Sequence, residues 1–271
     1  MIRFLILAGY FELTMYLQLS GKLNQYINLH YSYLAYISMF LSFVLALVQL
    51  IIWVKQMKIH SHLSGFWAKV ASIFLLCIPL FVGLFFPTVT LDSQTVSAKG
   101  YHFPVAAGSS KEIQQDEGTT TQYLKPDTSS YFTKSAYESE MKQVAKKYVD
   151  KKVIQVTTEN YMEVMEVIYD YPDQFAGKTI ELTGFVYNDP NNKNSQFLFR
   201  FGIIHCIADS GVYGLLTTGA PQHFENNTWI HAKGTLSIEY HKQLKQSLPV
   251  LHISDCQTIT KPDNPYVYRV F

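Results

Sequence analysis

Residues 177–209 read GKTIELTGFVYNDPNNKNSQFLFRFGIIHCIAD, and this stretch decides the fold. Two runs rich in β-branched and aromatic residues, 179–187 and 196–208, flank the turn-forming Asp-Pro-Asn-Asn segment. That pattern is typical of two consecutive strands. Three more strand-like runs follow, at 212–217, 228–240 and 250–260. Five strands of unequal length predict a small five-stranded β-barrel of the OB type.

Two helices are expected before this barrel. Residues 135–150 place apolar side chains at helical spacing, which predicts an amphipathic helix. Asn160 is expected to begin a second helix, with Glu163 as its partner in a capping box, and Pro172 is expected to end it. Residues 135–271 are therefore predicted to form one helix-preceded OB-like domain.

The N-terminal part has the composition of a membrane anchor. Residues 2–19, 33–54 and 66–86 are apolar runs long enough to cross a bilayer as helices, within an anchor spanning residues 1–87. A secretory signal peptide is the alternative for the first run, because Arg3 precedes its apolar core. Against that alternative, no small-x-small cleavage site follows and Glu12 interrupts the core. The fold class is thus a membrane-anchored α+β protein.

Residues 88–134 are dominated by Ser, Thr, Gly, Asp and Gln and show no sustained periodicity, so they are predicted to be a polar linker. From residue 88 onward the chain carries 17 Lys and Arg against 20 Asp and Glu. A domain with a net negative charge does not match a polyphosphate backbone, so we expect no nucleic-acid partner.

The basic residues of the anchor set its expected orientation. Lys55, Lys58 and Lys69 flank or lie in the loop between the second and third apolar runs. Short loops rich in Lys and Arg remain cytoplasmic. The third helix would then lead outward, which predicts a multi-pass protein of the cell membrane with an extracytoplasmic C-terminal domain in contact with the lipid bilayer.

His205, Cys206 and Asp209 are the strongest candidates for chemistry. Imidazole, thiolate and carboxylate are all ligands for zinc or a similar divalent metal, the only cofactor that the residues suggest. Adjacent residues on a strand point to opposite faces, which argues against His205 and Cys206 sharing one ion. A Cys206–Cys256 disulfide and a simple packing role for Cys206 beside a hydrogen-bonded histidine remain open alternatives. Two other histidines, His231 and His252, are placed in strands and would need to converge with His205.

Glu12 is the one acidic residue inside an expected membrane helix. Carboxylates at this depth are costly and face protein or water. Contact with another membrane subunit or an ion path is therefore one interpretation, and a position near the interface of a tilted helix is the other. No GxSxG, GxxxxGK[ST] or strand-linked GxGxxG motif is present, so no enzymatic activity is predicted.

Aromatic residues accompany Arg200 on the second predicted strand. Phe197, Phe199 and Phe201 alternate along it, and Tyr213 lies on the third strand. Such residues can form a stacking platform for single-stranded nucleic acid. The negative charge of the domain favours core packing instead.

The chain as a whole resembles the YcgQ-type bacterial membrane protein family, described as permease subunits with a domain of unknown function. The resemblance rests on SGKLNQYI, LDSQTVSAKG, FAGKTIELTGFVYNDP, RFGIIHCIADSGVYGLL and the terminal PYVY. In that family the segment matching residues 204–209 reads Thr-Cys-Cys-x-Ala-Asp, so Ile204 and His205 depart from it. The resemblance implies a multi-spanning permease as partner and a possible link to metal homeostasis. The chain is accordingly predicted to be an accessory permease subunit, or alternatively an extracytoplasmic metal-binding or chaperone module.

Overall fold

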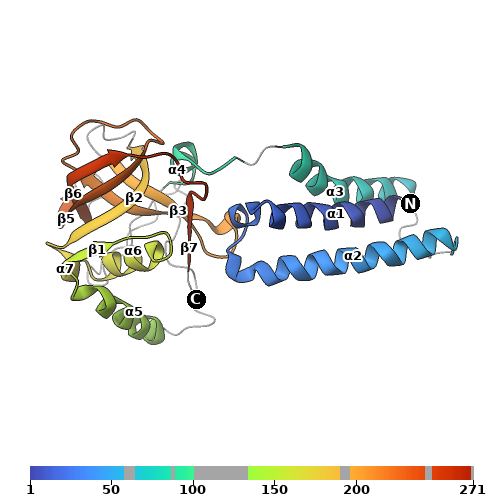
Figure 1. The fold of residues 1–271 in the computed structure, drawn as a ribbon, viewed down its shortest axis with the longest axis horizontal. Helices are drawn as coiled ribbons and strands as arrows, with labels where there is room; N and C mark the ends of the chain where they lie inside the picture. Colours follow the sequence, from blue (N-terminus) through green and yellow to red (C-terminus); the bar gives the residue numbers. More distant parts are fainter. Residues whose placement is uncertain (58–64, 87–88, 101–133, 190–195, 242–245, 270–271) are drawn as a thin grey trace. The chain divides into compact units, whose positions relative to one another are not determined.

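The computed structural model describes residues 1–57, 65–86, 89–100, 134–189, 196–241 and 246–269 of the 271-residue chain. They fall into two compact units, Met1–Thr90 and Leu91–Phe271. Figure 1 shows three long helices in the first unit and a sheet with short helices in the second. The basic loop residues 58–64, and with them Lys58, lie outside the described residues.

Three helices in the N-terminal unit are long and apolar enough to cross a membrane. They are α1 (Ile2–Leu19), α2 (Ser32–Val54) and α3 (Phe66–Phe85), with short 3-10 helices η1 (Lys22–Gln25) and η2 (Leu29–Tyr31) between the first two. Their mean hydropathies are 1.2 for α1, 2.5 for η2 with α2, and 2.2 for α3. The three expected apolar helices are therefore present, and each is long enough to cross a membrane.

Helix α1 packs against both α2 and α3. Its contact with α3 is reciprocal, because each helix places a leucine over a glycine of the other. A Cβ added to Gly9 would lie 3.0 Å from Leu80 Cδ1, and one added to Gly83 would lie 2.9 Å from Leu13 Cδ2. Small residues allow membrane helices to approach closely, which is the main source of their attraction in lipid.

Helix α3 contains Pro79, and α1 supplies a hydrogen bond near it. Proline has no backbone N–H to donate to the preceding turn, so carbonyls in that turn are weakly satisfied. The Tyr10 hydroxyl donates to the carbonyl of Leu76 at 2.9 Å. In lipid, freed backbone groups must find partners within the protein. Tyr10 therefore ties α1 to the turn of α3 that precedes the proline.

The C-terminal unit is built on a mixed seven-stranded sheet with the order β1-β2-β5-β6-β4-β3-β7. Its strands are β1 (Val153–Gln155), β2 (Thr179–Asn188), β3 (Gln196–Ile203), β4 (Gly211–Thr218), β5 (Trp229–His241), β6 (Gln246–Thr258) and β7 (Tyr266–Tyr268). Strand β2 also pairs with β3, so the pairings of β2, β5, β6, β4 and β3 return to their starting point. Within this ring only the β4–β6 pair is parallel.

Two short strands extend the sheet beyond the five predicted for the barrel, which correspond to β2–β6. Residues 153–156 were expected to be strand-like and form β1, whereas β7 was not expected; each pairs in parallel with a ring strand. Strand β7 escaped prediction because three residues carry too little pattern to mark a strand. Its position is fixed by distant contacts instead, above all those of Arg200.

Short helices cover the sheet and complete its core. They are α4 (Ser93–Lys99), α5 (Lys134–Val149), α6 (Tyr161–Asp170), α7 (Pro172–Phe175) and the 3-10 helix η3 (Ile207–Asp209). Helix α6 is nearly enclosed, with Tyr161, Met162, Met165 and Ile168 at most 2% exposed. Figure 1 shows α5, α6 and α7 grouped with β1 beside the larger strands.

Part of the expected linker belongs to the C-terminal unit. Asp92 caps α4 by accepting the amides of Gln94 and Thr95, and Val96 is fully buried in the core. The Leu91 amide donates to the Tyr266 hydroxyl at 3.0 Å. Residues 101–133 of the predicted linker lie outside the described part of the chain.

The expected capping box at Asn160 does not form. Asn160 makes no side-chain cap on α6; its Oδ1 accepts the Thr157 amide at 2.7 Å, and its Nδ2 donates to the Gln155 carbonyl. Glu163 accepts from the Tyr148 hydroxyl at 2.8 Å instead. Asn160 therefore joins α6 to β1 and Glu163 joins it to α5, and a local capping motif cannot indicate such contacts.

Candidate functional site

The HCIAD segment forms a tight loop organised by one carboxylate. Asp209 accepts the backbone amide of His205 at 3.0 Å and that of Cys206 at 3.0 Å, and its Oδ2 lies 2.7 Å from His205 Nδ1. Cys206 precedes η3 as its N-terminal residue, and Asp209 ends that helix. A carboxylate that accepts two backbone amides stabilises a turn in the way a helix cap does. The primary role of Asp209 is therefore structural.

The structure gives the metal hypothesis no support. His205 and Asp209 are brought together, but within the described residues no group of three or more His, Cys, Asp or Glu side chains could hold an ion. The Asp209 oxygens already accept the loop amides, so a metal would have to displace those bonds. His231 and His252, which might have joined His205, lie in other clusters.

The cysteines are free in the structure. Cys206 begins the η3 turn, whereas Cys256 lies on β6 opposite Ala232 of β5, and both are partly buried. Burial raises the pKa of the Cys256 thiol, with a smaller contribution from Asp255. A thiol with a raised pKa holds little thiolate at neutral pH. The Cys206–Cys256 disulfide stays a prediction.

Two histidines on the sheet each bridge neighbouring strands. His231 of β5 bonds Thr183 of β2 through Nδ1 at 2.9 Å and Glu181 through Nε2 at 3.0 Å. Such clusters stabilise pairs of strands across one face. The sequence indicated that His231 and His252 lie in strands but gave no indication of their carboxylate partners.

His252 of β6 forms a similar cluster with residues of both neighbouring strands, β4 and β5. It bonds Thr218 through Nδ1 at 2.8 Å, and its Nε2 lies 2.6 Å from Glu239 and 2.8 Å from Ser237. The hydrogen bond from Ser237, followed by that from His252, holds the pKa of the Glu239 carboxyl below its usual range. Both residues of the ion pair are about half exposed, so the cluster contributes to the surface of the sheet.

Arg200 is a core residue and a strand anchor. It is 3% exposed and donates to the carbonyls of Pro265, Asn264 and Tyr266 at 3.0–3.2 Å, and to the Thr158 hydroxyl. Its guanidinium also lies 5.7 Å from the ring centroids of Tyr161 and Trp229. Burial lowers the pKa of Arg200, but arginine starts so high that it stays protonated at neutral pH. The cation therefore holds the segment that leads into β7.

The aromatic residues near Arg200 are interior. Phe197, Phe199, Phe201 and Tyr213 are at most 2% exposed, and the rings of Phe197 and Phe199 stack at 5.2 Å. They cannot stack on a nucleic-acid base without unfolding the core. The prediction that these residues pack in the core is confirmed.

Glu12 lies on the exposed side of α1. The exposed residues Leu5, Glu12, Tyr16 and Leu19 recur at spacings of three, four and seven, which places them on one helical face. Within the described residues Glu12 makes no hydrogen bond or ion pair. It is ten residues from the start of α1, or roughly 15 Å along the axis, near the middle of a core about 30 Å thick. Partner contact or an ion path, and a position near the interface of a tilted helix, both remain open for Glu12.

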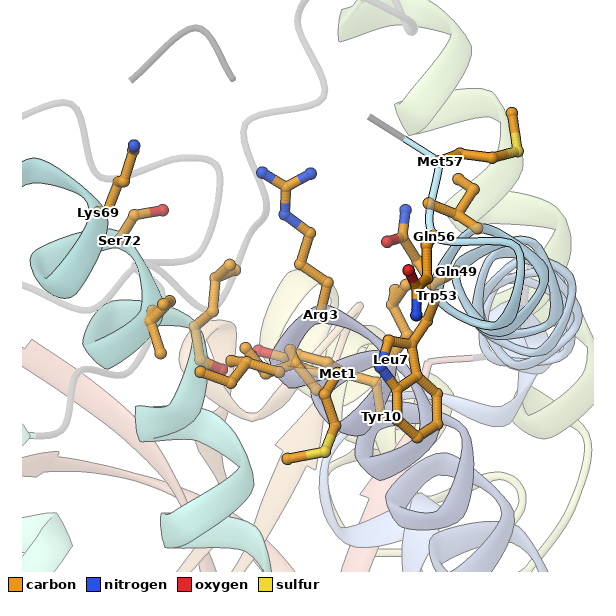
Figure 2. Close-up of a pocket in the computed structure, with 15 residues that line it drawn as sticks. Met1, Arg3, Leu7, Tyr10, Gln49, Trp53, Gln56, Met57, Lys69 and Ser72 are labelled. Carbon is orange, nitrogen blue, oxygen red and sulfur yellow. The ribbon is translucent and has the colours of Figure 1, made fainter. Parts of the chain in front are cut away.

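A cavity of about 970 Å³ opens between the three helices at the end where α1 and α3 begin and α2 ends. Figure 2 shows Arg3 of α1 extending between Lys69 and Ser72 on α3 and the α2 side chains Gln49, Trp53 and Gln56. Behind these polar groups the walls are apolar: Ile6, Leu7, Ile52, Ile73 and Leu76. Sequence reasoning missed this cavity, because the separation of α2 from α3 follows from how each packs on α1.

Comparison with known proteins also divides the chain in two, although the N-terminal match extends beyond Thr90 and includes α4. Residues 2–102 match the family model described as the DUF1980 N-terminal domain, and residues 131–269 match the DUF1980 C-terminal domain. The chain is 68% identical over its whole length to a Streptococcus mutans serotype c protein named "Putative two-component membrane permease complex subunit", all of which is covered. It is 40% identical over 291 aligned positions to the UPF0703 protein YcgQ of Bacillus subtilis, again with both chains fully covered.

These matches extend over both units and agree with the resemblance that the sequence motifs indicated. Together with three apolar helices of membrane-spanning length, they mark the chain as a membrane protein. The chain belongs to the DUF1980 family.

Proposed function

We propose that this protein is an accessory subunit of a membrane permease, docked on a multi-spanning partner through the exposed face of α1. The observation that carries the proposal is Glu12, a carboxylate near mid-membrane depth with no bond inside the described chain. An ionisable residue there is stable only when it faces protein or water. The name of the Streptococcus mutans relative, a subunit of a permease complex, supports the same role.

The exposed face of α1 is well suited to a helix of such a partner. Leu5 lies two turns before Glu12 and Tyr16 one turn after it, and they are 55% and 46% exposed. Helix α1 uses Gly9 and Leu13 to pack on α3, so docking on the face of Glu12 leaves this internal packing intact. A polar or basic side chain of the permease would supply the missing partner of Glu12.

For the C-terminal unit we infer a barrel of the OB type, formed by β2–β6. The closed ring of pairings, with one parallel pair between β4 and β6, supports this inference. We place the barrel on the extracytoplasmic side. The basic residues Arg3, Lys55 and Lys69 are expected on the cytoplasmic side, and α3 begins there and leads across the membrane toward the C-terminal unit. There it would assist the permease in handling substrate or ions as they enter or leave.

Affinity purification of the tagged full-length protein from its native membranes tests the proposal. We expect a multi-spanning protein to co-purify, and we expect Glu12→Gln to reduce its recovery about tenfold or more, as for a lost hydrogen bond to a charged group. Lys55→Gln is the control, because it removes a charge from the anchor outside this face. Absence of any multi-spanning protein from the wild-type sample would overturn the function, whereas equal recovery with Glu12→Gln would remove only the role of Glu12.

A further inference from the structure

The cavity between α1, α2 and α3 combines two features that complement a phospholipid, namely positive charge and an apolar lining. Its rim carries the cations Arg3 and Lys69 with the polar side chains of Ser72 and Gln56, and its depth is lined by aliphatic residues. No carboxylate is among the fifteen residues that line it. Its volume of about 970 Å³ lies near the top of the range of roughly 300–1,000 Å³ for small-molecule sites.

Both cations are available to a ligand. Arg3 and Lys69 are exposed, and the side chain of neither makes a hydrogen bond or an ion pair with any described residue. By contrast, Lys22 at the other end of α1 is engaged by the Tyr16 hydroxyl at 3.0 Å. Two unengaged cations of the anchor thus belong to the lining of its cavity.

We infer that this cavity binds an anionic phospholipid, with the headgroup phosphate between Arg3 and Lys69 and an acyl chain against Ile6, Leu7, Ile73 and Leu76. Arg3 lies at the first turn of α1 and Lys69 at the first turn of α3, so both charges are at the same membrane surface as lipid headgroups. Basic pockets between membrane helices are suited to anionic lipid headgroups. Ser72, one turn after Lys69, can add a hydroxyl donor to a phosphate oxygen.

Charge complementarity favours a lipid over a helix of a partner subunit. The surface of a membrane helix is mostly apolar, whereas a phospholipid brings a phosphate and apolar chains together. The inference goes beyond the permease role and does not depend on it, because the face of α1 that carries Glu12 is not part of the cavity lining.

Quenching of Trp53 fluorescence provides a direct test, because Trp53 lines the cavity. Full-length protein carrying Trp67→Phe and Trp229→Phe is reconstituted in phosphatidylcholine vesicles with small, equal mole fractions of brominated phosphatidylglycerol or brominated phosphatidylcholine. We expect phosphatidylglycerol to quench at a lower mole fraction. Arg3→Gln and Lys69→Gln should each reduce this preference about five-fold, as expected for one basic residue near anionic lipid.

Two variants separate the cavity from the general surface. Lys55→Gln removes a cation at the same end of the helices but outside the lining, and it should retain the preference. Ile73→Phe keeps both cations but fills the apolar depth, and it should abolish the preference. The inference is overturned if wild-type protein shows no preference, if Lys55→Gln loses as much as Arg3→Gln, or if Ile73→Phe has no effect. Photocrosslinking from position 73 to a permease helix rather than to lipid would also overturn it.

Discussion

Asp209 accepts the Cys206 backbone amide at 3.0 Å while its other oxygen lies 2.7 Å from the Nδ1 of His205. His205, Cys206 and Asp209, which most resemble a metal site, therefore form a turn in which the Asp209 carboxylate accepts hydrogen bonds from backbone amides. His205 contributes little to this turn beyond its amide, because its side chain is 56% exposed.

Asp209→Ala should destabilise the C-terminal unit far more than His205→Ala. Loss of a capping carboxylate costs about 1–2 kcal/mol, whereas an exposed ion pair contributes roughly 0–1 kcal/mol. Urea unfolding of the full chain, followed by Trp229 emission in a Trp53→Phe/Trp67→Phe background, measures both. Equal losses for the two variants would show that the side-chain pair, rather than the amide bonds, holds the loop.

Arg200→Gln should cost about 3–5 kcal/mol, because three buried carbonyls lose a charged donor. The loss of stability should be largest at β7, because this strand begins at the last of those carbonyls. Hydrogen exchange of residues 266–268 reports it locally. Lys146→Gln is the control for loss of a positive charge, because the Lys146 side chain is exposed. Unchanged protection of β7 in Arg200→Gln would contradict the anchoring role.

Gly83→Leu should destabilise the N-terminal unit by about 1–3 kcal/mol, because its side chain would meet Leu13. The reciprocal change Leu13→Gly should recover part of that loss when both are combined, since it opens space where the new leucine is placed. Thermal unfolding in detergent of the two single variants and the double variant forms a complete cycle. Strictly additive losses would mean that the two positions are not in contact.

Alkaline pH should unfold the C-terminal unit steeply. Burial raises the pKa of Tyr161, Tyr169 and Tyr213 above the ordinary value of about 10. Above pH 10 the unfolded chain therefore releases protons that the folded chain retains, so stability is unaffected below that pH and falls as the pH rises further. Each fully buried tyrosine should contribute up to about 1.4 kcal/mol per pH unit.

Tyrosinate absorbance and far-ultraviolet circular dichroism, recorded on the same samples between pH 9 and pH 12, test this expectation. Exposed tyrosines ionise first, and the later part of the absorbance change should coincide with the loss of circular dichroism, because the buried hydroxyls ionise only when the fold opens. Tyr161→Phe should make the transition less steep. Ionisation of all tyrosines near pH 10, while the circular dichroism stays native, would contradict this expectation.

Elements with strong local patterns were predictable. Three apolar runs gave the bounds of α1, α2 and α3 within one residue at each end, and alternating aromatic and β-branched residues located β2–β6. The distribution of charge separated an anchor from a polar domain. For the candidate site, the sequence indicated Glu12 as an unusual membrane residue, and the structure placed it on an exposed face.

By itself the sequence thus determined which segments form apolar helices long enough to cross a membrane and which form strands, because length, hydropathy and periodicity are local properties. Tertiary structure alone decided the rest. It decided that HCIAD is a turn held by Asp209, that Arg200 fixes β7, and that Arg3 and Lys69 share a cavity. These outcomes depend on residues brought together from distant parts of the chain, where hydrogen-bond geometry and the packing of α2 and α3 on α1 act and no local pattern is present.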